Sequence, residues 1–214
     1  MPETILCKIC GRRRARRACP AVEGEICPIC CGENREVTLT CPLECPYLTE
    51  AHAREKPIPI DERQMGNPDI VVLEEFIHKH HEMLMFFVFS LYQAAIRTPG
   101  AVDSDVIAAL DAAIQTRRTL ESGLVYEHIP ENAVAAAIQR MFSASLADYQ
   151  KVRGEREALA PLRNSEILSA LVFIQRVGLK NLNGKPKGRM YIDLLRQTAP
   201  PDMRVEERAP SIIL

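Results

Sequence analysis

Apolar residues recur at helical spacing through most of the chain after residue 69. Between residues 69 and 97 they return at intervals of three, four or seven positions, which places them on one face of a helix. This face consists of Leu73, Ile77, Leu84, Val88, Leu91 and Ala95. Asp69 can cap the start of the helix, and the sequence Thr98-Pro99-Gly100 can end it. The pattern therefore predicts one long helix over 69–97.

The same periodicity predicts further helices, joined by short connections. Their expected ranges are 104–125, 130–153, 164–178 and 189–197. Long amphipathic helices with short connections are typical of an antiparallel bundle. The sequence thus predicts a mainly α protein, with an antiparallel helical bundle over 69–198 and a flexible C-terminal tail over 199–214.

One stretch of the first predicted helix, Met83 to Leu91, is apolar almost all round. Phe86 and Phe89 fall on or near the side that is otherwise polar. A helix of this kind either lies at the centre of a bundle or is covered by a partner, which can be a second copy of the chain. The sequence leaves both alternatives open.

Residues 1–55 have a different character and form a cysteine-rich module. All eight cysteines of the chain lie between positions 7 and 45, and none occurs later. Residues 56–68 contain three prolines and a glycine among charged residues, which is typical of a semi-extended linker. The expected organisation is the module (1–55), the linker (56–68), the bundle (69–198) and the tail (199–214).

Two Cys-x-x-Cys pairs give the most specific signal in the sequence. Cys7 and Cys10 form the first pair, Cys27 and Cys30 form the second, and sixteen residues separate them. This spacing is typical of two turns that close on one tetrahedral zinc ion. A shell of four thiolates leaves no position for water, so we expect this zinc to be structural. Its binding would supply much of the folding energy of so small a module.

The other four cysteines are sufficient for a second four-thiolate site. They are Cys19, Cys31, Cys41 and Cys45. Cys45 precedes Pro46 and a predicted short helix, and the N-terminus of a helix favours a thiolate. His52 could replace one of these cysteines as a ligand. We therefore expect two Zn²⁺ ions, with the pairing of ligands left open.

This arrangement of cysteines resembles the two-zinc, interleaved fingers of the RING, MYND and HIT type. The resemblance covers about 40 residues and depends on cysteine pairing alone. The module differs from those families because it has no histidine among the cysteines and because Cys30 and Cys31 are adjacent. An iron–sulfur cluster is the alternative to zinc, since cysteine thiolates hold it too.

Charge and hydropathy limit the classes of function. The formal net charge is −1, which argues against a surface built wholly for nucleic acid. No secretory signal is visible, and the longest apolar stretch is far shorter than the ~20 residues that a membrane span needs. We therefore expect a cytoplasmic protein without a membrane segment, in which reducing conditions favour metal over disulfides.

Two basic segments are candidates for contacts with nucleic acid or phosphate. The first segment consists of Arg12, Arg13, Arg14, Arg16 and Arg17, and the second of Lys185, Lys187 and Arg189. The alternative is that the first is a solvated loop and the second a tight surface turn.

No catalytic constellation is apparent in the sequence. Glu75 and His78 form a Glu-x-x-His step, which di-iron bundles use in two copies, but a second copy is missing. His80 and His81 fall on the apolar side of the predicted helix. We predict a non-enzymatic zinc-binding protein that acts as a protein-interaction or regulatory module, with a protein partner or a second copy of itself. Nucleic-acid binding is the first alternative, and an iron–sulfur or di-metal redox protein is the second.

Overall fold

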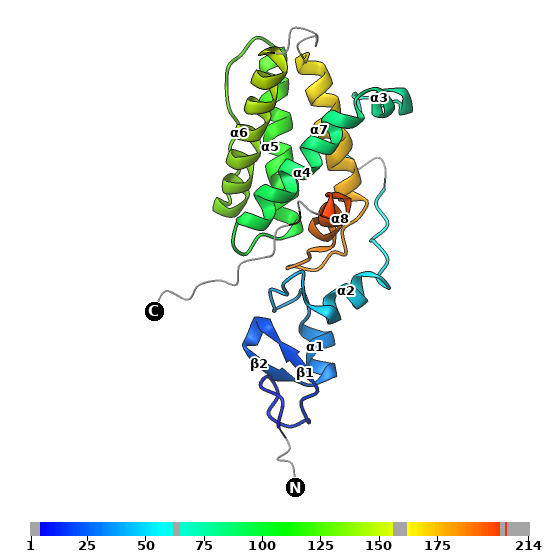
Figure 1. Cartoon of the computed structure of the whole chain (residues 1–214), viewed down its shortest axis with the longest axis vertical. Helices are drawn as coiled ribbons and strands as arrows, with labels where there is room; N and C mark the ends of the chain where they lie inside the picture. Colours follow the sequence, from blue (N-terminus) through cyan, green and yellow to red (C-terminus); the bar gives the residue numbers. More distant parts are fainter. Residues whose placement is uncertain (1–4, 62–64, 156–161, 202–203, 205–214) are drawn as a thin grey trace.

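The chain is mainly helical, with one small two-stranded sheet near the N-terminus (Figure 1). The computed structural model describes residues 5–61, 65–155, 162–201 and 204. Most of the predicted tail (202–203 and 205–214) lies outside the described residues. None of the helices in the described part combines the length and the apolar character that crossing a membrane requires.

The cysteine-rich module contains two short strands, a 3₁₀ helix over Pro20–Val22 between them, and two short α-helices. Strand β1 (Arg17–Cys19) pairs antiparallel with β2 (Gly24–Ile26), with Ala18 opposite Glu25. Helices α1 (Pro28–Asn34) and α2 (Pro46–His52) both begin with a proline that follows a cysteine at the N-cap. Proline suits this position because it has no N–H to leave unpaired. The structure thus confirms the short helix predicted after Cys45.

Six helices make up the rest of the described chain. They are α3 (Glu74–Lys79), α4 (His81–Arg97), α5 (Asp103–Glu121), α6 (Ala133–Glu155), α7 (Asn164–Leu179) and α8 (Met190–Thr198). Helix α5 packs against α6 and α7, and α4 packs against α6 and α8. Figure 1 shows α8 at the end of this helical region that faces the module.

The prediction of one helix over 69–97 is wrong in two respects. The helix begins at Glu74, because Asp69 does not cap it but pairs with Arg118 of α5 at 2.7 Å. It is also interrupted at His80, whose φ of −109° and ψ of 23° are not helical. The imidazole of His80 contacts the Phe76 ring at a tilt of 35°, with 4.5 Å between the ring centroids. The pairing of Asp69 with Arg118 in the tertiary structure therefore overrides the capping signal in the sequence.

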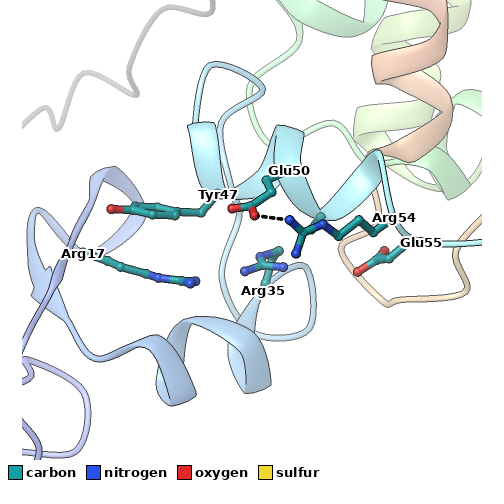
Figure 2. Close-up of a pocket in the computed structure, with 7 residues that line it drawn as sticks. Arg17, Arg35, Tyr47, Glu50, Arg54 and Glu55 are labelled. Carbon is teal, nitrogen blue, oxygen red and sulfur yellow. Dashed lines mark ion pairs between the residues drawn. The ribbon is translucent and has the colours of Figure 1, made fainter.

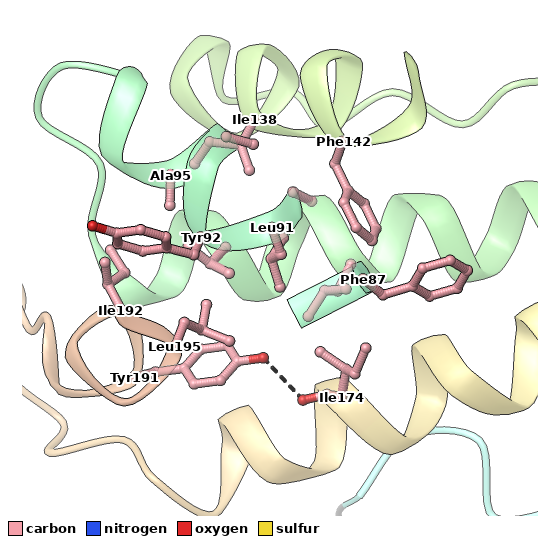
Figure 3. Packing of buried hydrophobic residues seen from close by; sticks show 14 of the residues in the cluster. Phe87, Leu91, Tyr92, Ala95, Ile138, Phe142, Ile174, Tyr191, Ile192 and Leu195 are labelled. Atoms are coloured by element: carbon pink, nitrogen blue, oxygen red, sulfur yellow. Dashed lines mark hydrogen bonds between the residues drawn. The ribbon is translucent and has the colours of Figure 1, made fainter. Parts of the chain in front are cut away.

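Helix α4 contributes the centre of the apolar core. Phe87 and Leu91 have no exposed surface, and the Phe87 ring meets Phe142 of α6 edge-on at 6.1 Å (Figure 3). Phe86, on the unexpectedly apolar side, stacks on Tyr149 of α6 at 4.4 Å. Phe89 is half-buried. Neighbouring helices of the same chain therefore cover much of the stretch from Met83 to Leu91, which is apolar almost all round.

The start of α8 is held by the start of α5. The two carboxylate oxygens of Asp103 accept hydrogen bonds from the backbone N–H groups of Tyr191 and Ile192, each at 3.0 Å. These N–H groups lie in the first turn of α8, where no helical partner exists. The Tyr191 hydroxyl donates to the Ile174 carbonyl at 3.0 Å (Figure 3). Helix α8 is thereby fixed against α5 and α7.

The predicted linker is held against the helical region where it is described. The Ile58 N–H donates to the Leu182 carbonyl at 2.9 Å, and Met65 is buried. Arg176 of α7 donates to the carbonyls of Asn67 and Ile70 at 2.7 and 2.9 Å. Residues 62–64 lie outside the described residues. These contacts join the described parts of the segment to α7 and the loop that follows it.

Candidate metal centre

Four cysteine side chains converge at one point of the module. The sulfur atoms of Cys7, Cys10, Cys27 and Cys30 all lie within 4.8 Å of one another, so this group can hold a metal ion. A tetrahedral zinc ion with bonds of ~2.3 Å would space its sulfurs about 3.8 Å apart, which fits this separation. Three of the four cysteines are buried, and Cys10 is half-buried. No other group in the described residues meets the same criterion.

Each Cys-x-x-Cys pair forms a turn that directs backbone N–H groups at sulfur. The N–H groups of Ile9 and Cys10 donate to the Cys7 sulfur, and the Cys30 N–H lies 3.4 Å from the Cys27 sulfur. Gly11 completes the first turn with a φ of +62°, a conformation that glycine adopts without strain. These donors favour the thiolate forms that a metal requires.

Short-range pairing brings the two turns together. The Cys7 N–H donates to the Arg13 carbonyl at 2.8 Å, and the Lys8 N–H donates to the Glu25 carbonyl at 3.0 Å. Glu25 belongs to β2, which leads directly into the second pair through the fully buried Ile26. The small sheet therefore positions the four sulfurs.

The electrostatics of this group would favour a bound cation. Burial raises the pKa of Cys7, but N–H donors from Cys10, Cys27 and Ile9 outweigh it and lower the pKa to about 6. Burial and the neighbouring cysteines raise the pKa of Cys30 to about 12. Backbone N–H groups of Arg12 and Arg13 also lower the pKa of Cys10, so the thiolate is favoured at Cys7 and Cys10 and opposed at Cys30. A metal ion between the sulfurs would supply positive charge that favours the thiolate at Cys30.

The remaining cysteines lie near the junction with the helical region. Cys19 ends β1, Cys31 lies in α1, Cys41 lies in the loop before α2, and Cys45 is the N-cap of α2. Cys19 is half-buried and the other three are buried. Their sulfurs do not meet the 4.8 Å spacing of the first group. The structure therefore brings the first predicted ligand set together but leaves the second wider apart.

The alternative of His52 as a metal ligand is wrong, because both ring nitrogens already have partners. Its Nε2 atom lies 2.9 Å from Glu36 Oε1, and its Nδ1 atom lies 3.1 Å from Asp193 Oδ2 of α8. These carboxylates outweigh burial and raise the pKa of His52 to about 9. His52 is therefore a buried imidazolium that joins the module to α8.

Glu36 is the residue of this junction that sequence reasoning missed. Its side chain has no exposed surface and accepts hydrogen bonds from His52, from the Arg189 N–H at 2.7 Å and from Asn183 at 2.9 Å. Glu36 itself has a φ of +56°, which is uncommon for a residue with a side chain. Its partners lie up to 153 positions away in the sequence, so no local pattern indicates it.

The second basic segment lies at the same junction. The Lys185 ammonium pairs with Glu55 at 2.5 Å, and Lys187 donates to the Thr38 carbonyl at 2.7 Å. Arg189 is buried and donates to the Cys41 carbonyl at 3.1 Å. The segment predicted as a phosphate site therefore contacts the module through all three cations.

The first basic segment remains largely on the surface. Arg12, Arg14 and Arg16 are exposed. The Arg13 guanidinium donates to the Cys27 sulfur, which raises the pKa of Arg13. Arg17 lies over the Tyr47 ring, 4.4 Å from its centroid. Two of the five arginines thus have roles within the module.

A cavity of about 310 Å³ lies between β1, α1 and α2 (Figure 2). Its charged side chains interact within the chain: Arg54 pairs with Glu50 at 2.7 Å, and Arg35 donates to the Cys31 sulfur at 3.5 Å. Glu55 is the partner of Lys185. Arg35, Arg54 and Glu55, which line the cavity, are therefore engaged by other groups of the chain.

The histidines of the helical region do not form a metal site with their neighbours. Glu75 and His78 are exposed, and His78 lies 3.6 Å from Glu74. His80 is half-buried beside Glu166 at 3.8 Å. His81 is exposed, contrary to its predicted place on the apolar side, because the interruption at His80 turns it outward. The described residues of helices α3 to α8 contain no cluster of metal-ligating side chains.

Comparison with known proteins adds no evidence about this site. No protein-family model matches the chain, and no similar curated protein or solved structure is found. The candidate site therefore rests on the geometry of its own residues.

Proposed function

We propose that the chain is a non-enzymatic zinc protein whose cysteine-rich module forms a protein-interaction surface. The observation that carries this proposal is the position of two isoleucines. Ile9 and Ile29 occupy the same place in the two Cys-x-x-Cys pairs, and they are 39% and 48% exposed. A metal ion held by these pairs would fix both side chains on the outside of a rigid turn. We propose an antiparallel bundle behind the module as its support.

Zinc is the proposed ion because four thiolates at tetrahedral spacing suit it and leave no position for substrate. Its role would then be structural. The cytoplasm, where reducing conditions keep thiols available for metal, is the proposed location. An iron–sulfur cluster would give the purified protein strong visible absorbance, whereas zinc gives none.

The surface beside the isoleucines indicates the chemistry of the partner. Ile5 and Leu6 are 57% and 54% exposed, and Leu6 forms a backbone bridge with Arg14. Apolar side chains next to exposed arginines complement an acidic protein surface that carries apolar residues. A second copy of this chain is an alternative partner.

The proposal is tested with Ile9→Asp/Ile29→Asp. Val152→Asp is the matched control, because Val152 is 50% exposed on α6, away from the module. Both variants should keep the metal content of the wild type. Quantitative affinity purification should recover partner proteins with the wild type and the control that the double variant loses. If the partner is a second copy of the chain, sedimentation should detect the self-association. Equal recovery by all three proteins, or protein purified without metal, would overturn the proposal.

Nucleic-acid binding remains the second candidate, because Arg12, Arg14 and Arg16 are exposed close to one another in the chain. This candidate predicts an affinity for nucleic acid that falls steeply as the salt concentration rises. Replacing these three arginines with glutamine should abolish binding to nucleic acid if this candidate is correct. The isoleucine variants should have little effect on that binding.

A further inference from the structure

We infer that Cys19, Cys31, Cys41 and Cys45 form a second tetrathiolate metal site, whose ion links the module to the helical region. This inference rests on the proposed function and extends it, because that function requires only the first site. It assigns a role to the four cysteines that the first site does not use.

The backbone around Cys19 repeats the geometry of the first site. The N–H groups of Ala21 and Val22 donate to the Cys19 sulfur, two and three residues further along the chain. The N–H groups of Ile9 and Cys10 donate to Cys7 with the same spacing. The turn after Cys19 therefore has the form of a ligand turn, although no second cysteine follows within it.

Two of the other three sulfurs, those of Cys41 and Cys31, also face donors. The Glu36 N–H donates to the Cys41 sulfur, and the Arg35 guanidinium lies 3.5 Å from the Cys31 sulfur. Cys45 is the N-cap of α2, and its side chain makes no capping hydrogen bond there. A four-thiolate zinc site carries a formal charge of −2, and Arg35 supplies part of the balancing charge.

The four cysteines are close enough to interact electrostatically. The Cys19 sulfur interacts with those of Cys31 and Cys45, and the Cys41 sulfur interacts with those of Cys45 and Cys19. Their sulfurs are nevertheless wider apart than those of the first group. The inference therefore requires cysteine side chains to rotate inward when the ion binds.

The position of the ligands gives the second site its role. Cys31 belongs to the buried cluster that contains Cys7 and Ile26. Cys41 and Cys45 belong to the cluster that includes the core of the helical region. Tyr47 and Leu39 pack against both clusters. An ion shared by these cysteines would cross-link the two cores.

Metal content of the full-length protein tests the number of sites. Elemental analysis of protein purified under reducing conditions should give two zinc ions per chain. Cys41→Ser/Cys45→Ser and the matched Cys7→Ser/Cys10→Ser should each retain one. Cobalt titration of the wild type, followed by thiolate-to-cobalt absorbance, gives the same count without any variant. One ion per wild-type chain would overturn this inference and leave the proposed function intact, whereas no ion would overturn both.

Hydrogen exchange tests the linking role separately. The N–H groups of Lys187 and Arg189 donate to the carbonyl and carboxylate of Glu36, so they report on the junction. Their exchange should become at least tenfold faster in Cys41→Ser/Cys45→Ser. It should change much less in Cys7→Ser/Cys10→Ser, whose lost ion lies away from the junction. Equal exchange rates in the two variants would contradict the linking role.

Discussion

The Nε2 atom of His52 lies 2.9 Å from the Oε1 atom of Glu36, a side chain with no exposed surface. The other ring nitrogen faces Asp193 of α8 at 3.1 Å. An imidazole placed between two carboxylates donates from both nitrogens only when it is protonated. The junction between the module and the helical region is therefore built around a buried positive charge.

Replacing His52 with alanine should destabilise the protein strongly. The change leaves Glu36 and Asp193 buried without their shared cation, and breaking a buried pair in this way costs about 3–5 kcal/mol. Lys185 still contacts Glu36 and Arg196 still contacts Asp193, so we expect a loss near the lower end of this range, about 3 kcal/mol. Urea denaturation of the metal-loaded protein measures the loss. His81→Ala, at an exposed histidine, is the control and should stay within about 0.5 kcal/mol of the wild type. Equal stability of the two variants would show that the pairing contributes nothing.

Stability should fall as the pH rises above neutrality. The pKa of His52 is about 9 in the folded protein and 6.5 without its partners. A raised pKa contributes stability that is complete below 6.5 and is lost as the pH rises through about 9. The difference between these two pKa values corresponds to roughly 3 kcal/mol of folding stability. Urea denaturation between these two pH values measures the loss, and a His52→Gln variant should lose this dependence. A wild-type protein equally stable at both pH values would contradict a buried imidazolium.

Removing metal should unfold the module before the helical region. Structural zinc contributes on the order of 10 kcal/mol to the folding of small modules, and this one has few buried apolar residues of its own. A chelator under reducing conditions should expose residues 5–31 to proteolysis. Circular dichroism should retain most of its helical signal, because α4 to α8 have a separate core. A module that resists proteolysis without metal would refute the metal-dependent fold.

Gly178→Ala should destabilise the helical region through steric conflict. A Cβ atom at this position would lie 2.5 Å from the Tyr191 ring and 2.8 Å from Ile107. Overpacking of this kind costs about 1–3 kcal/mol, and thermal unfolding measures it.

The control for this change is Gly154→Ala in α6. A Cβ atom there would meet nothing within 4 Å, and alanine favours a helix over glycine by up to about 1 kcal/mol. Gly178→Ala should therefore lower the stability of the protein, and Gly154→Ala should raise it. Destabilisation of the same size in both would mean that the contact with Tyr191 is not the cause.

Several features could be predicted from local patterns. The spacing of Cys7, Cys10, Cys27 and Cys30 indicated a metal-binding group, and their sulfurs converge. Apolar periodicity placed α5 to α8 within a few residues of their observed bounds. The break at His80 could not be predicted, because the residues around it keep helical spacing and the interruption arises in the folded structure.

The sequence by itself determined the metal-binding turns and the helical faces, because both depend on residues a few positions apart. Cysteines three apart meet in any tight turn, and apolar residues at helical spacing share a face wherever the helix lies. Only the tertiary structure decided the roles of His52, Glu36 and the segment from Lys185 to Arg189. Their partners across the junction are 130 to 153 positions away in the sequence, so only folding brings His52 and the predicted phosphate loop into one junction.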